Sequence, residues 1–129
     1  MGTIKPQQIL MPQKVHIGDT AELRCTFNSP SQKLKGITAS GKVDFDTSVF
    51  QKPLDENEFE VLNITLIPAG PDYFQLSVTF IPWKTGVIKF PNIVIEDTEL
   101  VIDPEEIVSL TEQYKTTTLQ DSASPLLLP

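Results

Sequence analysis

Residues 20–28, TAELRCTFN, decide the fold class because polar and apolar side chains alternate from one end of the stretch to the other. The apolar side chains on one face are Ala21, Leu23, Cys25 and Phe27. An antiparallel strand that covers a core with one face and meets water with the other has this period of two. The stretch therefore predicts a β-strand. Gly18, which can adopt a positive φ, provides the turn that leads into it.

The same alternation recurs later in the chain, most regularly over residues 73–81. Shorter apolar runs lie at 42–46, 86–90, 92–96 and 99–102. Residues that favour turns separate the runs, including Asp97-Thr98 between the last two. About seven or eight short strands at this spacing predict an all-β protein, an immunoglobulin-like antiparallel β-sandwich.

The run over 59–67 contains two phases of alternation. Phe59 and Val61 share one phase, whereas Leu62, Ile64 and Leu66 share the other. A β-bulge near Val61 would reconcile the two phases, because one extra residue reverses the facing of every residue after it. A strand buried on both faces is the alternative, and the sequence does not choose between them.

The length of 129 residues suits one domain. We expect an N-terminal segment or edge strand at 1–13, the sandwich at 14–103, a short helix or turn at 104–115, and a linker or tail at 116–129. Glu105 and Glu106 would lie in the first turn of the helix, where acidic side chains suit the positive end of its dipole.

Two sequence features concern the edges of the sheets. Pro12 and Lys14 interrupt the first strand, and proline and charge are typical of a protected edge. The run 99–102 contains neither proline nor lysine. We therefore expect residues 104–114 to pack over the edge of that run.

The composition limits the kinds of partner that the protein could bind. A net charge of −7 disfavours nucleic acid, since both surfaces would be negative. The sequence has no basic cluster to dock on anionic lipid and no apolar run long enough to cross a bilayer, so we expect no direct membrane insertion by this segment. We expect a protein partner, a monomeric domain and no cofactor. The single cysteine excludes an intramolecular disulfide.

Few residues could carry catalysis. His16 is the only histidine, and the sequence has no Gly-x-Ser-x-Gly motif to supply a nucleophile beside it. Its alternation with Val15 and Ile17 places it on a solvent face. Cys25 shares its face with apolar neighbours, so we expect a buried and unreactive thiol. We therefore expect no catalytic residues.

Acidic residues raise the question of calcium. Asp44 and Asp46 share one face of the run 42–46, and further carboxylates lie at Asp55, Glu56, Glu58 and Glu60. Calcium requires six or more converging oxygens, and the spacing matches no EF-hand. We therefore interpret these residues as a solvated face and expect no metal site.

The loop that follows the strand at 73–81 carries the best candidate for a contact. Trp83 lies between Pro82 and Lys84 at the loop tip, and exposed aromatic side chains in loops commonly anchor partners. The alternative is that Trp83 folds back over the open end of the sandwich. The candidate contact residues are Trp83, Lys84 and Tyr73.

One family resemblance rests on residues 73–91, YFQLSVTFIPWKTGVIKFP, and on 17–23, IGDTAEL. A strand, a Pro-x-Lys-x-Gly turn and a strand ending in an aromatic residue and proline resemble the late strands of immunoglobulin-like domains in bacterial envelope proteins. The segment is similar in particular to the BatD (aerotolerance) family, over about residues 14–102. The missing cysteine pair and the position of Trp83 in a turn depart from the antibody superfamily.

The resemblance implies an exported domain on the periplasmic or extracellular face of the cell envelope, tethered by a membrane helix outside this sequence. It implies no catalytic residues. We expect a non-catalytic interaction or spacer module. A carbohydrate-binding module using Trp83, Tyr73 and Phe50 is the alternative, and an enzyme ranks third.

Overall fold

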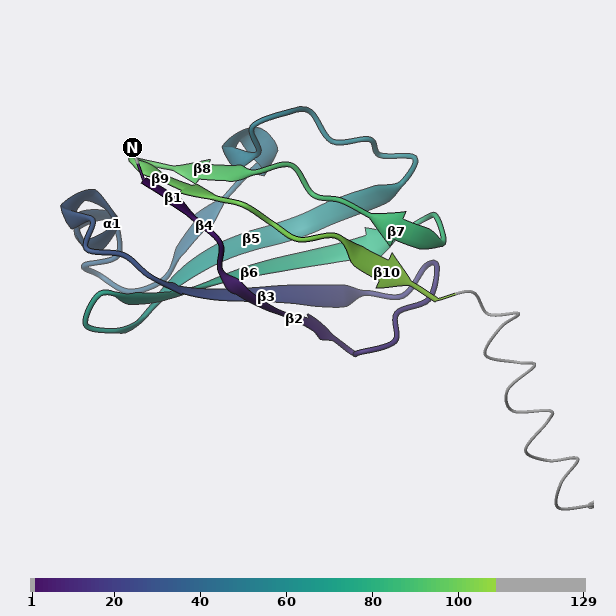
Figure 1. Cartoon of the computed structure of the whole chain (residues 1–129), viewed down its shortest axis with the longest axis horizontal. Helices are drawn as coiled ribbons and strands as arrows, with labels where there is room; N and C mark the ends of the chain where they lie inside the picture. Colours follow the sequence, from purple (N-terminus) through teal and green to yellow (C-terminus); the bar gives the residue numbers. More distant parts are fainter. Residues whose placement is uncertain (1, 109–129) are drawn as a thin grey trace, which may run out of the picture.

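The computed structural model describes residues 2–108 and shows a sandwich of two β-layers (Figure 1). The first layer is a five-stranded antiparallel sheet in the order β2-β3-β6-β5-β4. Its strands are β2 (Gln7–Met11), β3 (Ala21–Asn28), β6 (Tyr73–Pro82), β5 (Phe59–Gly70) and β4 (Val43–Phe45). The all-β sandwich predicted from the sequence is confirmed.

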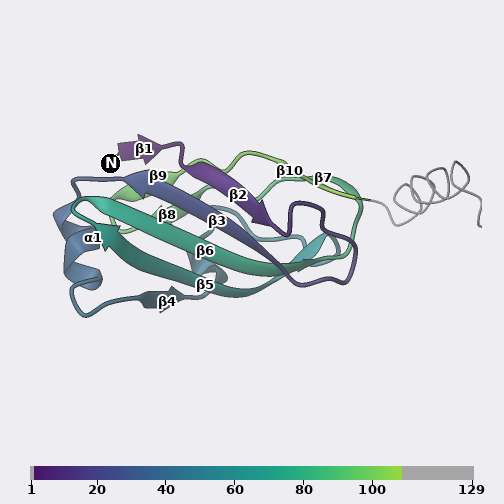
Figure 2. The ribbon, with the colours of Figure 1, turned by 90° about the horizontal axis from the view of Figure 1, so that it is seen from below.

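The second layer is made of short strands (Figure 2). A three-stranded sheet has the order β1-β9-β8, and a two-stranded sheet pairs β10 with β7. Their bounds are β1 (Gly2–Ile4), β7 (Gly86–Ile88), β8 (Ile93–Ile95), β9 (Thr98–Leu100) and β10 (Glu105–Ile107). The pairing of β1 with β9 is parallel, and the other pairings in this layer are antiparallel.

The pairings β8–β9 and β7–β10 are two halves of one hairpin. Ile95 pairs with Thr98 at the turn, and Ile88 pairs with Glu105 further away, without any slip in register between the two halves. The ladder is interrupted where Pro91 and Pro104 lie, and proline has no N–H to donate to a ladder.

The long strands follow the predicted alternation. β3 and β6 bury every second side chain against the second layer, from Ala21 to Phe27 and from Phe74 to Phe80. The bulge in β5 is confirmed, because the register between β5 and β6 shifts between Val61 and Asn63. Leu62 is the extra residue and is 49% exposed, so burial on both faces is wrong there.

The structure has ten strands in the described residues, more than the seven or eight predicted, because the second layer is divided into three-residue pieces. It also contains α1 (Gln32–Ile37) and the 3-10 turn η1 (Thr47–Val49), which the sequence did not predict. The Ser31 hydroxyl accepts the Leu34 N–H at 3.1 Å and so caps α1. The turn between β8 and β9 is Glu96–Asp97, one residue before the predicted position.

The expectations for the C-terminal part need two corrections. Residues Glu105–Ile107 form β10, so no helix begins at Pro104, and the rest of the expected helix lies outside the described residues. β9 is not an edge strand, because β1 and β8 pair with its two sides, and Glu105–Ile107 pair with β7 instead. Within the described part of the chain, no helix is long and apolar enough to cross a bilayer.

Aromatic rings join the two layers. Phe90, from the interruption in the second-layer hairpin, packs on Phe59 at 4.4 Å and on Phe80 at 5.1 Å between ring centroids. Phe50 stacks on Phe90 at 6.0 Å. All four side chains are buried, so the centre of the sandwich is an aromatic cluster that belongs to both sheets.

Candidate functional site

The only cysteine is part of the core. Cys25 faces inward from β3 between Leu23 and Phe27, and its side chain is fully buried. Burial, and secondarily the charge of Glu105, raise the pKa of the Cys25 thiol to about 12. The thiol is therefore protonated at neutral pH, and a protonated thiol is a poor nucleophile. The predicted burial is confirmed.

His16 lies in the loop between β2 and β3, and its side chain is only 15% exposed. Its Nδ1 atom is 3.4 Å from Oδ2 of Asp19, and its Nε2 atom is buried without a partner among the described residues. The predicted solvent face is wrong because this segment is a turn, in which the Asp19 N–H donates to the His16 carbonyl at 3.1 Å, and not a strand.

Asp44 and Asp46, considered as calcium ligands from the sequence, form hydrogen bonds with other side chains of the domain. Asp44 accepts a hydrogen bond from the Thr65 hydroxyl at 2.7 Å across the β4–β5 pair. Asp46 accepts the hydroxyl and the N–H of Ser48 at the start of η1, and these bonds hold the pKa of Asp46 below its usual value. Over residues 2–108, no three His, Cys, Asp or Glu side chains converge closely enough to hold a metal ion.

Trp83 and Lys84 lie together at one end of the sandwich, where β6 turns into β7 (Figure 1). The Trp83 N–H donates to the Glu58 carbonyl at 2.8 Å, and Lys84 Nζ lies 3.7 Å from the Glu58 carboxylate. The indole packs on Gly18, since a β-carbon added there would lie 3.9 Å from Trp83 Cζ3. Trp83 nevertheless stays 45% exposed, so it covers the end of the sandwich and also offers a surface.

Two further side chains make this end of the molecule apolar. Ile17 directly precedes Gly18 in the loop that touches Trp83, and it is exposed. Val87 follows on β7, and it is also exposed. We call this surface, made of Ile17, Gly18, Trp83, Lys84 and Val87, the Trp83 end. Ile17 and Val87 were not among the contact residues predicted from the sequence, because no local pattern shows that they lie at the same end of the molecule as Trp83.

The other candidate contact residues lie elsewhere. Tyr73 begins β6, at the end of the molecule that holds α1, whereas Trp83 follows the last residue of the same strand. Ten residues of strand at about 3.3 Å each separate the two by roughly 30 Å. Phe50 is buried, and it forms an isolated bridge with Ile93. The structure therefore brings Trp83 and Lys84 together but separates them from Tyr73 and Phe50.

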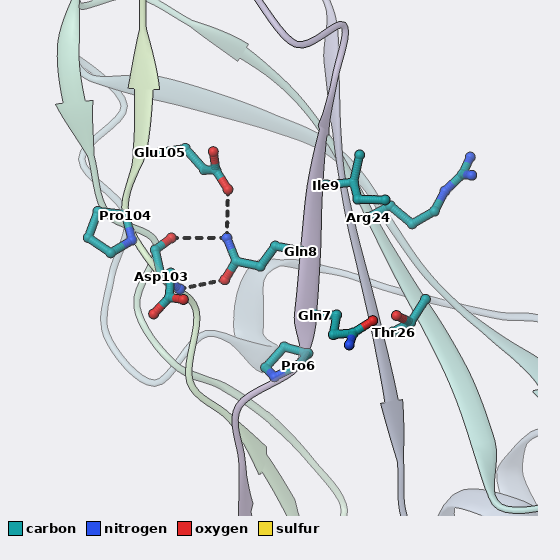
Figure 3. A pocket seen from close by; sticks show the side chains of 9 residues that line it. All are labelled: Pro6, Gln7, Gln8, Ile9, Arg24, Thr26, Asp103, Pro104 and Glu105. Carbon is teal, nitrogen blue, oxygen red and sulfur yellow. Dashed lines mark hydrogen bonds between the residues drawn. The ribbon is translucent and has the colours of Figure 1, made fainter.

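A groove of about 580 Å³ lies against β2, between outward-facing side chains of β3 on one side and residues 103–105 of the second layer on the other (Figure 3). Its residues are Pro6, Gln7, Gln8, Ile9, Arg24, Thr26, Asp103, Pro104 and Glu105. Sequence analysis gave no signal for this groove, because its two sides come from residues about 95 positions apart.

Gln8 holds the two sides of this groove together. Its amide oxygen accepts the Asp103 N–H, and its Nε2 atom donates to the Asp103 carbonyl at 3.1 Å (Figure 3). The same Nε2 atom donates to the Glu105 carboxylate at 2.8 Å. Gln8 thus pairs with the backbone of Asp103 as a neighbouring strand would, at the point where the hairpin ladder is interrupted.

Comparison of the chain with protein-family models, curated proteins and solved structures gave no match. The similarity to the BatD family therefore stays a prediction from the sequence.

Proposed function

We propose that this domain is a non-catalytic interaction module that contacts another protein through the Trp83 end. The observation that supports the proposal most directly is the state of Trp83, which is exposed and yet held in place. Its backbone is fixed by Glu58 and its ring rests on Gly18. An aromatic side chain that is ordered before binding loses less conformational entropy when a partner covers it. Tryptophan is also among the residues that most often dominate the energy of an interface.

The state of the two possible catalytic side chains supports a role without catalysis. The Cys25 thiol is buried and protonated, and it points into the core rather than into a cleft. His16 is largely buried, and its Nδ1 atom lies beside the Asp19 carboxylate. A general base must reach the proton that it abstracts in a bound substrate, and neither group presents such a geometry.

The carbohydrate alternative has less support. Sugar recognition on a sandwich uses several exposed aromatic faces that lie together. Phe50 is buried under Phe90, and Tyr73 lies at the opposite end from Trp83. Trp83 is the only one of the three candidates on this surface.

The resemblance to BatD-like domains supports a place in the cell envelope. In this proposal the sandwich lies outside the cytoplasm and is tethered by a membrane helix outside this sequence. A fusion to alkaline phosphatase, which needs disulfides and is active only outside the cytoplasm, tests the location. An inactive fusion at every junction would contradict it.

Photo-crosslinking tests the contact. A benzophenone amino acid replaces Trp83 in the full protein, in cells that produce it, and a second protein carries the same group at Leu62. Leu62 has a similar exposed fraction but lies on β5, outside the Trp83 end. We expect one discrete adduct from position 83 and none from position 62. No adduct from position 83 would favour a spacer over an interaction module.

Tryptophan fluorescence separates the protein partner from the carbohydrate. Trp83 is the only tryptophan, so the emission spectrum reports on this site alone. We expect soluble cell-wall oligosaccharides to leave the spectrum unchanged. A saturable shift with such a glycan would overturn the choice of a protein partner.

A further inference from the structure

The free side of β2 has the features of a strand-addition site. In a sheet, an edge strand directs the N–H and C=O groups of alternate residues away from its one neighbour, and an extended peptide can pair with them. In the described residues, β2 pairs only with β3. Its sequence, Gln7-Gln8-Ile9-Leu10-Met11, contains no charge and no proline.

The opposite edge of the same sheet differs. β4 is only three residues long, carries Asp44, and is followed by Asp46. Short length and charge are the common protections of an edge against further pairing. β2 has neither protection within its five residues, although Pro6 and Pro12 limit a paired segment to that length. The five-stranded sheet is therefore open on the β2 side.

The groove beside β2 gives an added strand different surroundings on its two faces (Figure 3). On the outer face, Ile9 is 57% exposed and is the main apolar side chain. On the inner face, the wall is made by Pro104 and the Glu105 carboxylate. Successive residues of a strand point to opposite faces, so a bound segment would need apolar residues alternating with residues that suit Glu105.

The charges around the groove indicate which charge a bound side chain should carry to interact with Glu105. The other charged residues of the wall have partners of opposite sign: Arg24 lies 3.2 Å from Glu22, and Asp103 lies 3.3 Å from Lys5. Among the described residues, the hydrogen-bond partner of the Glu105 carboxylate is the neutral amide of Gln8, and no positive side chain forms a salt bridge with it. The whole chain is also acidic, with a net charge of −7. A positive side chain is the complement of this wall.

We propose that the β2 edge binds an extended protein segment in which apolar residues alternate with lysine or arginine. The segment adds a sixth strand to the five-stranded sheet, with its apolar residues on Ile9 and its basic residues facing Glu105. The clamp between Gln8 and Asp103 fixes the spacing of the two walls before binding, so little ordering is needed.

Two other occupants suit the groove less well. A second copy of this chain would pair β2 with β2 and bring the Glu105 carboxylates of two acidic molecules together, where they would repel each other. Residues 109–129 of this chain contain one lysine, Lys115, against Glu112 and Asp121, and no alternation of apolar and basic residues. Both remain outcomes that the experiment can detect.

Fluorescence anisotropy of the full chain with a labelled heptapeptide, Val-Lys-Val-Lys-Val-Lys-Val, tests the proposal. We expect saturable binding that weakens with added salt. A peptide with glutamate in place of each lysine should bind at least tenfold more weakly. A peptide of the same charge with a central proline should lose binding, because proline removes an N–H that pairs with β2. Equal binding of the proline peptide would reduce the effect to nonspecific charge attraction and overturn the proposal.

Two pairs of variants locate the peptide. Glu105→Gln keeps an acceptor for Gln8 and should weaken binding about fivefold, the effect of losing one partly screened charge. Its matched control, Glu106→Gln on the same strand but outside the groove, should not change the affinity. Ile9→Lys should weaken binding at least tenfold, whereas Leu62→Lys on β5 should have little effect. An affinity that Glu105→Gln and Ile9→Lys leave unchanged would contradict this site.

Further measurements exclude the other occupants. Sedimentation that shows a dimer of the wild-type chain, abolished by Ile9→Lys, would place a second copy in the groove. A chain ending at Val108 that binds the peptide more than tenfold more tightly would assign the groove to residues 109–129. Replacement of Trp83 by alanine should leave peptide binding unchanged, so failure here and failure of the proposed contact at the Trp83 end are distinguishable.

Discussion

The two layers of the sandwich are held together in different ways. The first layer has strands of up to 12 residues, with a continuous ladder from β2 to β4. Most of the second layer is a single hairpin that is interrupted halfway along, and the side chains of Gln8 and Lys89 bind the carbonyl groups of Asp103 and Ile102 there. The comparison shows that a continuous backbone ladder runs through one layer, whereas the other is bridged at its interruption by side chains, one of which, Gln8, comes from the first layer.

The largest effect on stability is expected where side chains of the two layers pack on each other. Phe80→Ala removes a fully buried ring that contacts Phe59 from the first layer and Phe90 from the second. Deleting a buried phenylalanine ring typically costs about 3–5 kcal/mol. We expect a loss of that size in the free energy of unfolding, measured by urea denaturation. A loss of less than about 1 kcal/mol would show that the rings do not form a common core.

The next effect is expected at Cys25 on β3 and depends on pH. The pKa of Cys25 is raised from 9.0 to about 12 on folding, so above pH 9 the unfolded chain loses this proton while the folded chain keeps it. The folded state then binds more protons, and its stability falls as the pH rises from 9 toward 12, by about 1 kcal/mol per pH unit. This stability is fully present below pH 9.

Cys25→Ala provides the control for the other groups that titrate in this range. The difference in unfolding free energy between wild type and variant should change with pH above 9 and stay constant between pH 6 and 8. A thiol reagent should also react slowly with native Cys25 and rapidly in denaturant. Fast labelling of the native protein would contradict the burial that underlies both expectations.

Loss of the hydrogen bonds between Gln8 and Asp103 should have a smaller effect on stability, and we expect it in the second layer. Gln8→Leu leaves the N–H and the carbonyl of Asp103 without their side-chain partner, and the loss of hydrogen bonds to such half-buried groups costs about 1 kcal/mol. We expect faster hydrogen exchange of the amides in β7 and β10, with little change in β3 and β6. Gln7→Leu, at the neighbouring exposed position, is the control and should change exchange in neither layer.

The smallest effect is expected at His16. Its Nε2 atom is buried without a partner in the described chain, so a phenylalanine of similar shape removes an unsatisfied polar atom. We expect His16→Phe to stabilise the protein by less than about 1 kcal/mol, measured as a rise in melting temperature. Clear destabilisation would mean that the contact with Asp19 outweighs the unsatisfied nitrogen.

The first layer could be predicted from the sequence because its strands are long enough to show a period of two. β3 alternates through Ala21 and Phe27, and the two phases in β5 correctly indicated a bulge. In the second layer, the apolar runs at 86–90, 92–96 and 99–102 predicted β7, β8 and β9, whereas the three residues of β10 include two glutamates and show no apolar period. Glu105 and Glu106 therefore predicted a short helix or turn, where the structure has a strand.

The candidate sites were harder to predict because they depend on distance in space. Trp83 was found from its place at a loop tip, and Tyr73 was grouped with it although a whole strand separates them. Phe50 was counted as an exposed platform because nothing in its neighbourhood shows that it pairs with Ile93. The groove along β2 depends on Gln8 meeting Asp103, a contact between distant residues that no local pattern encodes.

The parallel strand β1 has a consequence for how the chain folds during synthesis. β1 pairs with β9, and the Ile4 carbonyl accepts the Val101 N–H at 2.9 Å, so the earliest strand needs a partner made almost at the end of the domain. The strands β2 to β6 are complete at Pro82, before any residue of β7 to β10 has been made. Until then the apolar faces of β3 and β6 have no second layer to cover them, and exposed apolar surface in a partly folded chain promotes aggregation. A ribosome that stalls between Pro82 and Asp103 would therefore release a sheet that needs a chaperone, whereas termination after β10 would release a closed domain.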